Sequence, residues 1–273
     1  MTALLKIEWL KIKKYPAFWW MLGIVALTYP GINLIFYTIY KGITVKNEDM
    51  ATAVAKSILG NPFAFPETWH SVAYFSSCFV VIPAILVIMI ITNEYTYKTH
   101  RQNIIDGWSR NQFVSSKLID VFIITIVATL MYIATAAGYG FTIKDESTTG
   151  VWTDQIQYIP LFFIQTFSQL SIAFLLGFLI KKSFIALGLF VFYAIVLENI
   201  IAGYLNLKDI PLSRFLPLEI SDKIIPGPSF LGKFNEAKYT QSLALINQQV
   251  IYSILLTAAV WAFCYWHYNK RDL

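Results

Sequence analysis

The sequence predicts an all-α polytopic membrane protein, with residues 1–273 forming a single transmembrane domain. Of the 273 residues, 57% are hydrophobic and only 14% are charged, which leaves too little polar surface for a soluble protein of this size. The mean hydropathy is +0.58. The apolar residues gather in six stretches of about 20 residues, the length that crosses a hydrocarbon core of about 30 Å. Such stretches must be helices because isolated strands cannot satisfy their backbone groups in lipid.

An interfacial helix is predicted ahead of the first span, over residues 2–14. Its apolar Trp9 and Ile12 share one stripe, and Lys11 and Lys14 can reach lipid phosphates. The alternative for this stretch is a simple positive flank to the span.

The first span is too long for a signal peptide, so the N-terminus is expected to be retained. The six predicted spans cover residues 17–40, 71–92, 118–139, 159–180, 183–204 and 246–266.

The charges of the loops predict the orientation. An even number of spans places both termini on one side, and the loops on that side hold 12 of the 21 Lys and Arg residues, with a net charge of +7. The opposite loops have a net charge of −1. Because basic loops stay in the cytoplasm, both termini are predicted to be cytosolic in the inner membrane. Lys181 and Lys182, in a very short turn, are the clearest marker.

The loops on the outer side differ in character. In the first outer loop, residues 49–59 can form a short helix. Pro83 lies within the second span that follows this loop and should bend it. The extracytoplasmic segment 205–245 holds four of the ten prolines and mixes charges with apolar pairs. It is too polar to span the membrane and too apolar for a free linker. A cap that lies at the interface or re-enters the membrane is therefore favoured over a small folded loop.

Apart from Asp120 at the cytosolic start of the third span, Glu198 is the one acidic residue inside a predicted span, about six residues from the outer end of the fifth. An ionisable group at this depth, on the order of 9 Å, is costly and by default a functional candidate. A substrate-path role is one interpretation of Glu198. The other is that it is hydrated from the outer side or pairs locally with Asn199.

Residues 93–117 form a polar, basic segment between the second and third predicted spans. On a helix with 100° per residue, part of this segment forms one aromatic, apolar and basic stripe. The stripe consists of Tyr97, Arg101, Ile104 and Trp108, with Ile105 beside it. Such a helix can lie on lipid headgroups or fill a groove on a soluble partner, and composition alone does not separate these two roles.

The sequence lacks the residues that most membrane enzymes require. No G-x-x-x-x-G-K-[ST] motif is present, so the chain is not expected to hydrolyse ATP itself. The histidines, His70, His100 and His267, fall outside the spans or at their ends, which disfavours haem, zinc and intramembrane Ser-His chemistry. We expect no catalytic residue, no cofactor, no metal and no nucleic-acid partner on this chain. Cys78 and Cys264 are expected to be packing residues.

The polar segment and the C-terminus follow a recognisable order of residue types. In the segment this order is Glu94, Thr99, Ile104-Ile105, Ser109-Arg110, Phe113 and Lys117. The ending, residues 266–273, has an aromatic residue followed by basic residues and Asp-Leu. With six spans and a long segment before the last one, the chain resembles the permease subunits of ABC-2 type ABC transporters. Lys98 stands where that family usually has Gly, and Gly107-Trp108 stands where it has Pro.

This resemblance implies a transport function. The chain would be the membrane-spanning subunit of an exporter, dimerise with a second permease copy, lie in membrane lipid and couple to a cytosolic ATPase that binds ATP and Mg. The residues implied in ATPase coupling are Glu94, Tyr97, Thr99, Arg101, Ile104, Ile105, Trp108 and Arg110. The alternative is a non-transporting scaffold or sensor that docks a cytosolic partner. The sequence does not identify the substrate.

Overall fold

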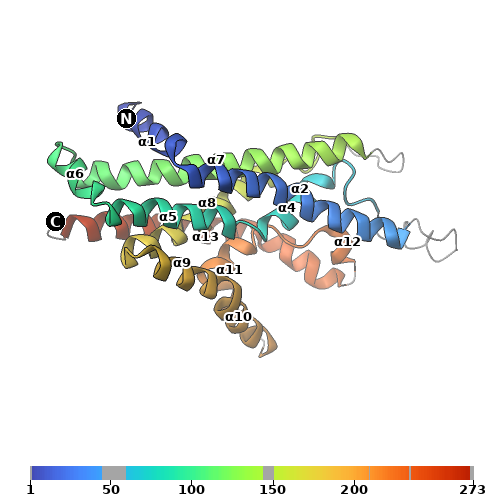
Figure 1. Cartoon of the computed structure of the whole chain (residues 1–273). Helices are drawn as coiled ribbons and strands as arrows, with labels where there is room; N and C mark the ends of the chain where they lie inside the picture. Colours follow the sequence, from blue (N-terminus) through green and yellow to red (C-terminus); the bar gives the residue numbers. More distant parts are fainter. Residues whose placement is uncertain (1, 45–59, 144–150, 209, 234, 271–273) are drawn as a thin grey trace.

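The computed structural model describes residues 2–44, 60–143, 151–208, 210–233 and 235–270. Within these ranges every regular element is helical and no strand occurs, so the predicted all-α fold is confirmed there. The long helices run roughly along one axis and form an elongated bundle (Figure 1). The helix predicted over residues 49–59 lies outside the described residues.

Five described helices are long and apolar enough to cross a membrane, and a bent pair of shorter helices would bring the number to six. This confirms the prediction of a membrane protein at the level of composition and length. The five are α2 (Pro16–Thr44), α7 (Arg110–Thr142), α8 (Tyr158–Ile180), the run Ser183–Leu207, and α13 (Glu236–Lys270).

The bent pair consists of α4 (Thr68–Ser77) and α5 (Val81–Thr96), whose axes differ by 48°. Pro83 lies in the first turn of α5, where its missing N–H needs no partner. A helix that continued from α4 would leave the carbonyl of Phe79 without its usual donor at Pro83. The break before Val81 removes this conflict, and the Phe79 carbonyl instead accepts from the N–H of Ile82 at 3.0 Å.

Helix α8 is the centre of the bundle. It contacts α4, α5, α7, α9, α11 and α13, and its most apolar stretch is 61% buried, against 17% for α2. Its buried aromatic residues join those of neighbouring helices, as in the stacked pair Phe162 and Tyr132. This central position fixes the surrounding helices around one core. The small first element, α1 (Thr2–Lys14), packs against α7 beside one end of the bundle.

The run Ser183–Leu207 leaves the bundle at an angle (Figure 1). It consists of α9 (Ser183–Phe192), one π-helical turn (Tyr193–Leu197) and α10 (Glu198–Leu207). Most of its apolar side chains are exposed; Phe184 is 90% exposed and Leu207 is 87% exposed. The surface of this run therefore resembles a lipid-facing or partner-facing helix more than a packed one.

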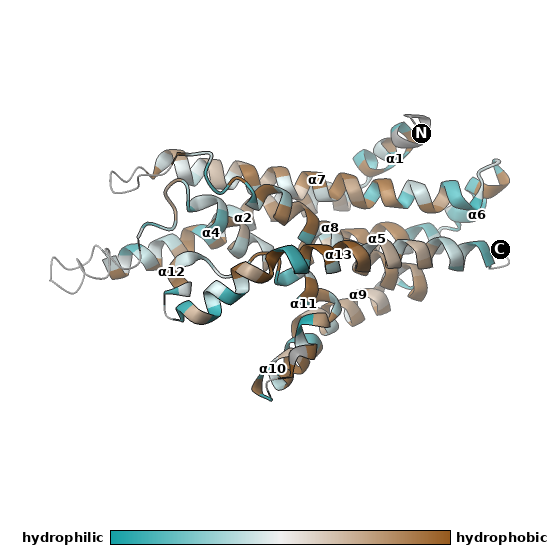
Figure 2. Ribbon diagram, turned by 180° about the vertical axis from the view of Figure 1, so that it is seen from behind, coloured by the Kyte–Doolittle hydropathy of each residue, from teal (hydrophilic) through white to brown (hydrophobic). Residues whose placement is uncertain are grey.

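The segment predicted over residues 205–245 folds into short helices that return to the bundle. After a 3-10 turn (Pro211–Phe215), α11 (Pro217–Asp222) lies about half-way along the bundle against α8 and α13 (Figure 2). The buried Ile224 and Ile225 join the main core. Beyond α12 (Ser229–Gly232), α13 already begins at Glu236. The helix thus begins ten residues before the predicted start of the last span at residue 246, because the polar first turns of α13 continue the same helix.

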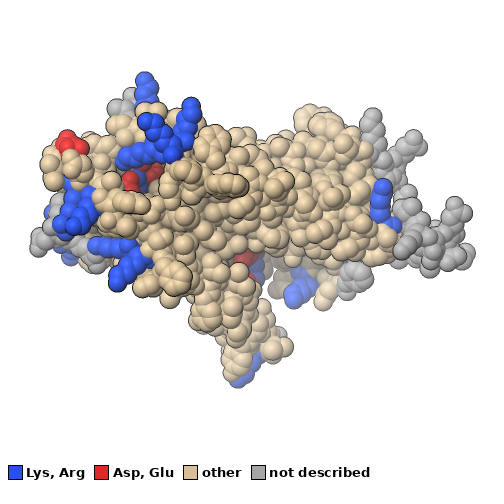
Figure 3. Space-filling model, in the orientation of Figure 1, with Lys and Arg blue, Asp and Glu red and all other residues tan. Residues whose placement is uncertain are grey.

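Lys and Arg side chains gather at the end of the bundle that carries α1, α6 (Thr99–Ile105) and the last turns of α13 (Figure 3). Among the described residues, the opposite end shows far fewer on this face. Such a distribution is typical of a helical membrane protein whose basic end stays on one side.

Candidate functional site

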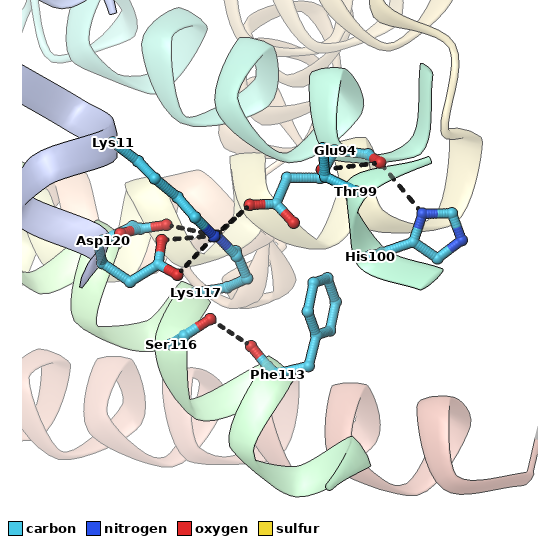
Figure 4. Close-up of polar contacts among 9 residues, drawn as sticks. Lys11, Glu94, Thr99, His100, Phe113, Ser116, Lys117 and Asp120 are labelled. Carbon is cyan, nitrogen blue, oxygen red and sulfur yellow. Dashed lines mark hydrogen bonds and ion pairs between the residues drawn. The ribbon is translucent and has the colours of Figure 1, made fainter. Parts of the chain in front are cut away.

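A buried cluster of charges joins α1, α5 and α7 at the basic end of the bundle (Figure 4). The ammonium group of Lys117 on α7 donates to Glu94 on α5 at 2.7 Å and to Glu8 on α1 at 2.8 Å. Its third hydrogen bond goes to Asp120, one turn along α7, at 2.9 Å. Lys11 donates to Glu8 from the outer side at 3.0 Å. We call Glu8, Lys11, Glu94, Lys117 and Asp120 the ion-pair cluster.

The ion-pair cluster carries one more negative than positive charge when all its groups are ionised. The side chain of Lys117 is 1% exposed, and its three protons are all used by carboxylates. Oε2 of Glu94 and Oδ1 of Asp120 are buried without a hydrogen-bond partner in the described part of the chain. A cavity of about 120 Å³ borders these carboxylates and is large enough for water. The cluster therefore stabilises its helices only as a set, because each carboxylate depends on the same ammonium group.

The charge of Glu8 should make stability depend on acid pH. Burial by itself would raise the pKa of Glu8, but the ammonium groups of Lys117 and Lys11 lower it from 4.5 to about 2. The unfolded chain then binds a proton before the folded chain does, so this stabilisation is complete above about pH 4.5 and is lost as the pH falls through about 2. We expect Glu8→Gln to flatten the decline of the thermal unfolding midpoint between these pH values.

Thermal unfolding in detergent at a series of pH values measures this effect. Glu236→Gln, an exposed acid at the start of α13, is the matched control and should keep the slope of the wild type. Equal slopes for Glu8→Gln and wild type would show that Glu8 does not gain its charge stabilisation from the cluster.

The loop between α5 and α7 is built by two residues with positive φ. Lys98 has φ 55° and ends α5, and Gly107 has φ +97° and ends α6. Ser109 then begins α7 with a capping box, in which its hydroxyl accepts from the N–H of Gln112. The prediction of one continuous helix over residues 97–108 is therefore wrong. Helix α6 covers only Thr99–Ile105, and the left-handed residues at both ends interrupt the periodicity on which the stripe was based.

This loop distributes the predicted coupling residues over two environments. Tyr97, Arg101 and Ile105 are exposed, and Tyr97 and Ile105 are 75% and 77% exposed. Ile104 packs partly into the core, and the Trp108 ring lies 5.5 Å from the ammonium group of Lys11. The remaining three predicted residues make direct contacts: the buried Glu94 with Lys117, the exposed Thr99 with the carbonyl of Glu94, and the half-buried Arg110 with the carbonyl of Asn269.

Lys98 holds a conformation that suits glycine. A left-handed backbone costs a residue with a Cβ roughly 1–2 kcal/mol, and glycine avoids this cost while losing more chain entropy on folding. We expect Lys98→Gly to raise stability by up to about 1 kcal/mol, and Lys98→Ala to give no such gain. Thermal unfolding of the two variants in detergent compares them directly, and a glycine variant no more stable than the alanine variant would contradict the strain argument.

The last turns of α13 close the site from the side opposite α1. Arg110 donates to the carbonyl of Asn269 at 2.6 Å, and the hydroxyls of Ser115 and Tyr265 lie 2.8 Å apart. The rings of Phe113 and Tyr268 stack with centroids 4.9 Å apart. The N-terminal helix, the segment 93–117 and the C-terminal helix thus meet around the start of α7.

Glu198, the predicted acid inside a span, is buried at the start of α10 and contacts α11. Its Oε1 accepts from the backbone N–H groups of Leu218 and Glu219 at 2.8 and 2.7 Å. These contacts attach the first turn of α11 to α10. Its neighbour Asn199 is exposed and donates to carbonyls of the preceding turn, so the predicted local pair with Glu198 is not formed.

Comparison with known families gives one match, to a family described as "Protein of unknown function (DUF2705)", over residues 34–273. The chain belongs to the DUF2705 family. No match among the curated proteins was found. The part matched to DUF2705 includes Glu94, Lys117 and Asp120, whereas Glu8 and Lys11 precede it.

Sequence reasoning on this DUF2705 protein missed three members of the ion-pair cluster: Glu8, Lys11 and Asp120. The available signal was the spacing of Glu8 and Lys11, and of Lys117 and Asp120, three residues apart on their helices. This spacing predicts local pairs only. It contains no information on which helices would share one ammonium group.

Proposed function

We propose that this DUF2705 chain is the membrane-spanning subunit of an ATP-driven ABC transporter, an exporter that relies on a separate cytosolic ATPase. The observation that carries the proposal is the position of the ion-pair cluster directly behind α6. Lys117 connects α1, α5 and α7 through Glu8 and Glu94, while α6 points its exposed residues away from the bundle. A partner bound to α6 would therefore act on several helices together.

The outer side of the loop supplies the proposed contact. Tyr97, Arg101 and Ile105 combine an aromatic ring, a guanidinium and an aliphatic side chain, all exposed. Aromatic and Arg side chains are frequent anchors at protein interfaces. The Trp108 ring contacts the ammonium group of Lys11, and Arg110 donates to the Asn269 carbonyl on α13. These two contacts would keep the loop between α5 and α7 in place when the partner binds.

ATP-driven closure of two ATPases would push on this loop. Both ends of the loop are fixed, at Glu94 by Lys117 and at Arg110 by Asn269. The push would then pass to α5 and α7 as rigid bodies. Such coupling requires that the ATPase bind two states of the membrane subunit with different affinities.

The proposed layout has six spans, with α4 and α5 counted as one bent span and both termini cytosolic. The gathering of basic side chains at the end with α1, α6 and the last turns of α13 supports this orientation (Figure 3). The apolar surface left exposed on α9 and α10 supports contact with lipid or with a second permease copy. ATP and Mg would bind only to the partner ATPase.

Co-expression with a candidate ABC ATPase, chosen from the genes that neighbour this one, tests the proposal. We expect the two proteins to purify together in detergent, and Arg101→Glu with Ile105→Asp to remove the ATPase from the complex. Lys41→Glu, an exposed charge at the other end of the bundle, should leave the complex intact.

Each outcome separates one part of the proposal. If no ATPase associates with the wild type, the transporter function is wrong. If the ATPase associates equally with the double variant, the contact surface on α6 is wrong. Capture of a cytosolic partner other than an ATPase, again lost in the double variant, would favour the alternative role as a scaffold or sensor.

A further inference from the structure

A second site is found away from the ion-pair cluster. A cavity of about 690 Å³ lies between α10, α11, α12 and the first turns of α13. These elements are away from the end that carries α1 and α6 (Figures 1 and 2). The volume falls within the range of sites for small organic molecules, about 300–1,000 Å³.

Asp222, the last residue of α11, lines this cavity. Its Oδ1 accepts from the side-chain amides of Gln165 at 3.2 Å and Gln169 at 2.5 Å, both on α8. Apart from these two hydrogen bonds, Asp222 is exposed to the cavity. Within the described ranges it forms no ion pair with a Lys or Arg side chain. Gln249 on α13 lines the same cavity, is 1% exposed, and has a side-chain oxygen without a hydrogen-bond partner there. In the described part of the chain the wall thus presents one carboxylate without a cation, Asp222, and one amide oxygen without a donor, that of Gln249.

The other acid at the cavity is already neutralised. Glu219 pairs with Lys223 at 2.9 Å, one turn away on α11. Arg214 lies over the ring of Phe215, with its guanidinium carbon 5.6 Å from the centroid. Among the acids that line the cavity, Asp222 is the one left without a cation in the described part of the chain.

The walls favour an organic ligand over a metal ion. No group of three His, Cys, Asp or Glu residues that could hold a metal occurs among the described residues. Tyr74, Tyr239, Leu231 and Leu245 instead supply aromatic and aliphatic surface. Tyr239 packs directly on the backbone of α12, where a Cβ at Gly232 would lie within 2.4 Å of its ring. Aromatic faces next to a carboxylate are a typical environment for an organic ammonium group.

We propose that this cavity binds an organic cation, an ammonium group on an apolar body, with Asp222 as the counter-ion and Gln249 as a second acceptor. The site is in a different part of the molecule from the proposed ATPase contact, and binding requires no transport activity.

The titration of Asp222 gives the binding a pH dependence. Asp222 is exposed to the cavity, but the protein around the cavity removes bulk solvent from its carboxyl group. This desolvation, with a further contribution from Glu219 and Glu198, raises the pKa of Asp222 to about 7. A cation pairs only with the ionised carboxylate, so binding should strengthen as the pH rises through 7. The titratable or charged groups near Asp222 come from five elements. They are Glu219 on α11 and Lys223 directly after it, Glu198 on α10, Arg214 in the 3-10 turn, Lys238 and Tyr239 on α13, and Tyr74 on α4 with Cys78 directly after it.

Calorimetric titration of the full chain in detergent tests the proposal with three matched probes. Tryptamine carries the cation, tryptophol replaces it by a neutral hydroxyl, and indole-3-propionate replaces it by an anion. At pH 8 we expect wild type to bind tryptamine more tightly than either analogue. At pH 6 we expect tryptamine to bind more weakly than it does at pH 8. Asp222→Asn should weaken tryptamine binding by about tenfold or more and remove its pH dependence, whereas Glu236→Gln, at an exposed acid outside the cavity lining, should change it little.

A thermal unfolding scan of each variant shows whether it is folded. Should Asp222→Asn fail to fold, Leu245→Trp is the second variant, because an indole in the cavity should block tryptamine without touching the carboxylate. The proposal is overturned if wild type binds the three probes equally or binds none, or if folded Asp222→Asn or Leu245→Trp binds tryptamine like wild type. None of these results bears on the ATPase contact, since no ATPase is present.

Discussion

Lys117→Met should be the most damaging single substitution at the basic end of the bundle. It removes the ammonium group that neutralises Glu8, Glu94 and Asp120, all three of which are buried. Breaking a buried ion pair by removal of one partner costs about 3–5 kcal/mol because the remaining charge is uncompensated. We expect the thermal unfolding midpoint in detergent to fall by roughly 10 °C or more, or the protein to be lost before purification.

Two further variants make this prediction specific. Lys11→Met removes the other ammonium group of the cluster, but its side chain is 38% exposed, so we expect a loss of less than about 1 kcal/mol. Lys117→Met combined with Glu94→Gln and Asp120→Asn leaves Glu8 to pair with Lys11 and should recover part of the stability. Equal midpoints for Lys117→Met and Lys11→Met would mean that Lys117 does not hold the three helices together.

Composition predicted the coarse fold well. A span is defined by a run of apolar residues, so α2, α7, α8 and α13 each contain a predicted span. The ends of the helices were less predictable, because the polar turns at Glu236 and Arg110 continue a helix without continuing its apolar pattern. The return of α11 to the bundle depends on contacts with α8 and α10, which local sequence does not encode.

The candidate site was predicted only in part. The order of residue types singled out Glu94 and Lys117, and the structure brings these two into contact at 2.7 Å. The stripe from Tyr97 to Trp108 was based on a regular helical period, which Lys98 and Gly107 interrupt. The contributions of Glu8 and Asp120 came from tertiary packing, which determines how several carboxylates share one cation.

Glu198→Ala should weaken the attachment of α11 to α10. Oε1 of Glu198 accepts from the N–H groups of Leu218 and Glu219, and without it these donors lose their partner. Each donor left unsatisfied costs about 1–3 kcal/mol, so for two donors we expect a total loss of roughly 2–6 kcal/mol. Hydrogen–deuterium exchange at the first residues of α11 should rise, and the thermal unfolding midpoint should fall.

Glu198→Gln separates this anchoring role from a role in a substrate path. The glutamine retains a carbonyl oxygen for both N–H groups, so stability should fall by about 1 kcal/mol, much less than for alanine. Asn199→Ala, at the exposed neighbouring position, is the control and should leave the exchange of α11 unchanged. If the glutamine variant is as unstable as the alanine variant, the negative charge and not the hydrogen bonds holds α11. If both variants keep wild-type exchange at α11, Glu198 does not anchor this helix, and its burial has to be explained by another function of the carboxylate, such as the substrate path.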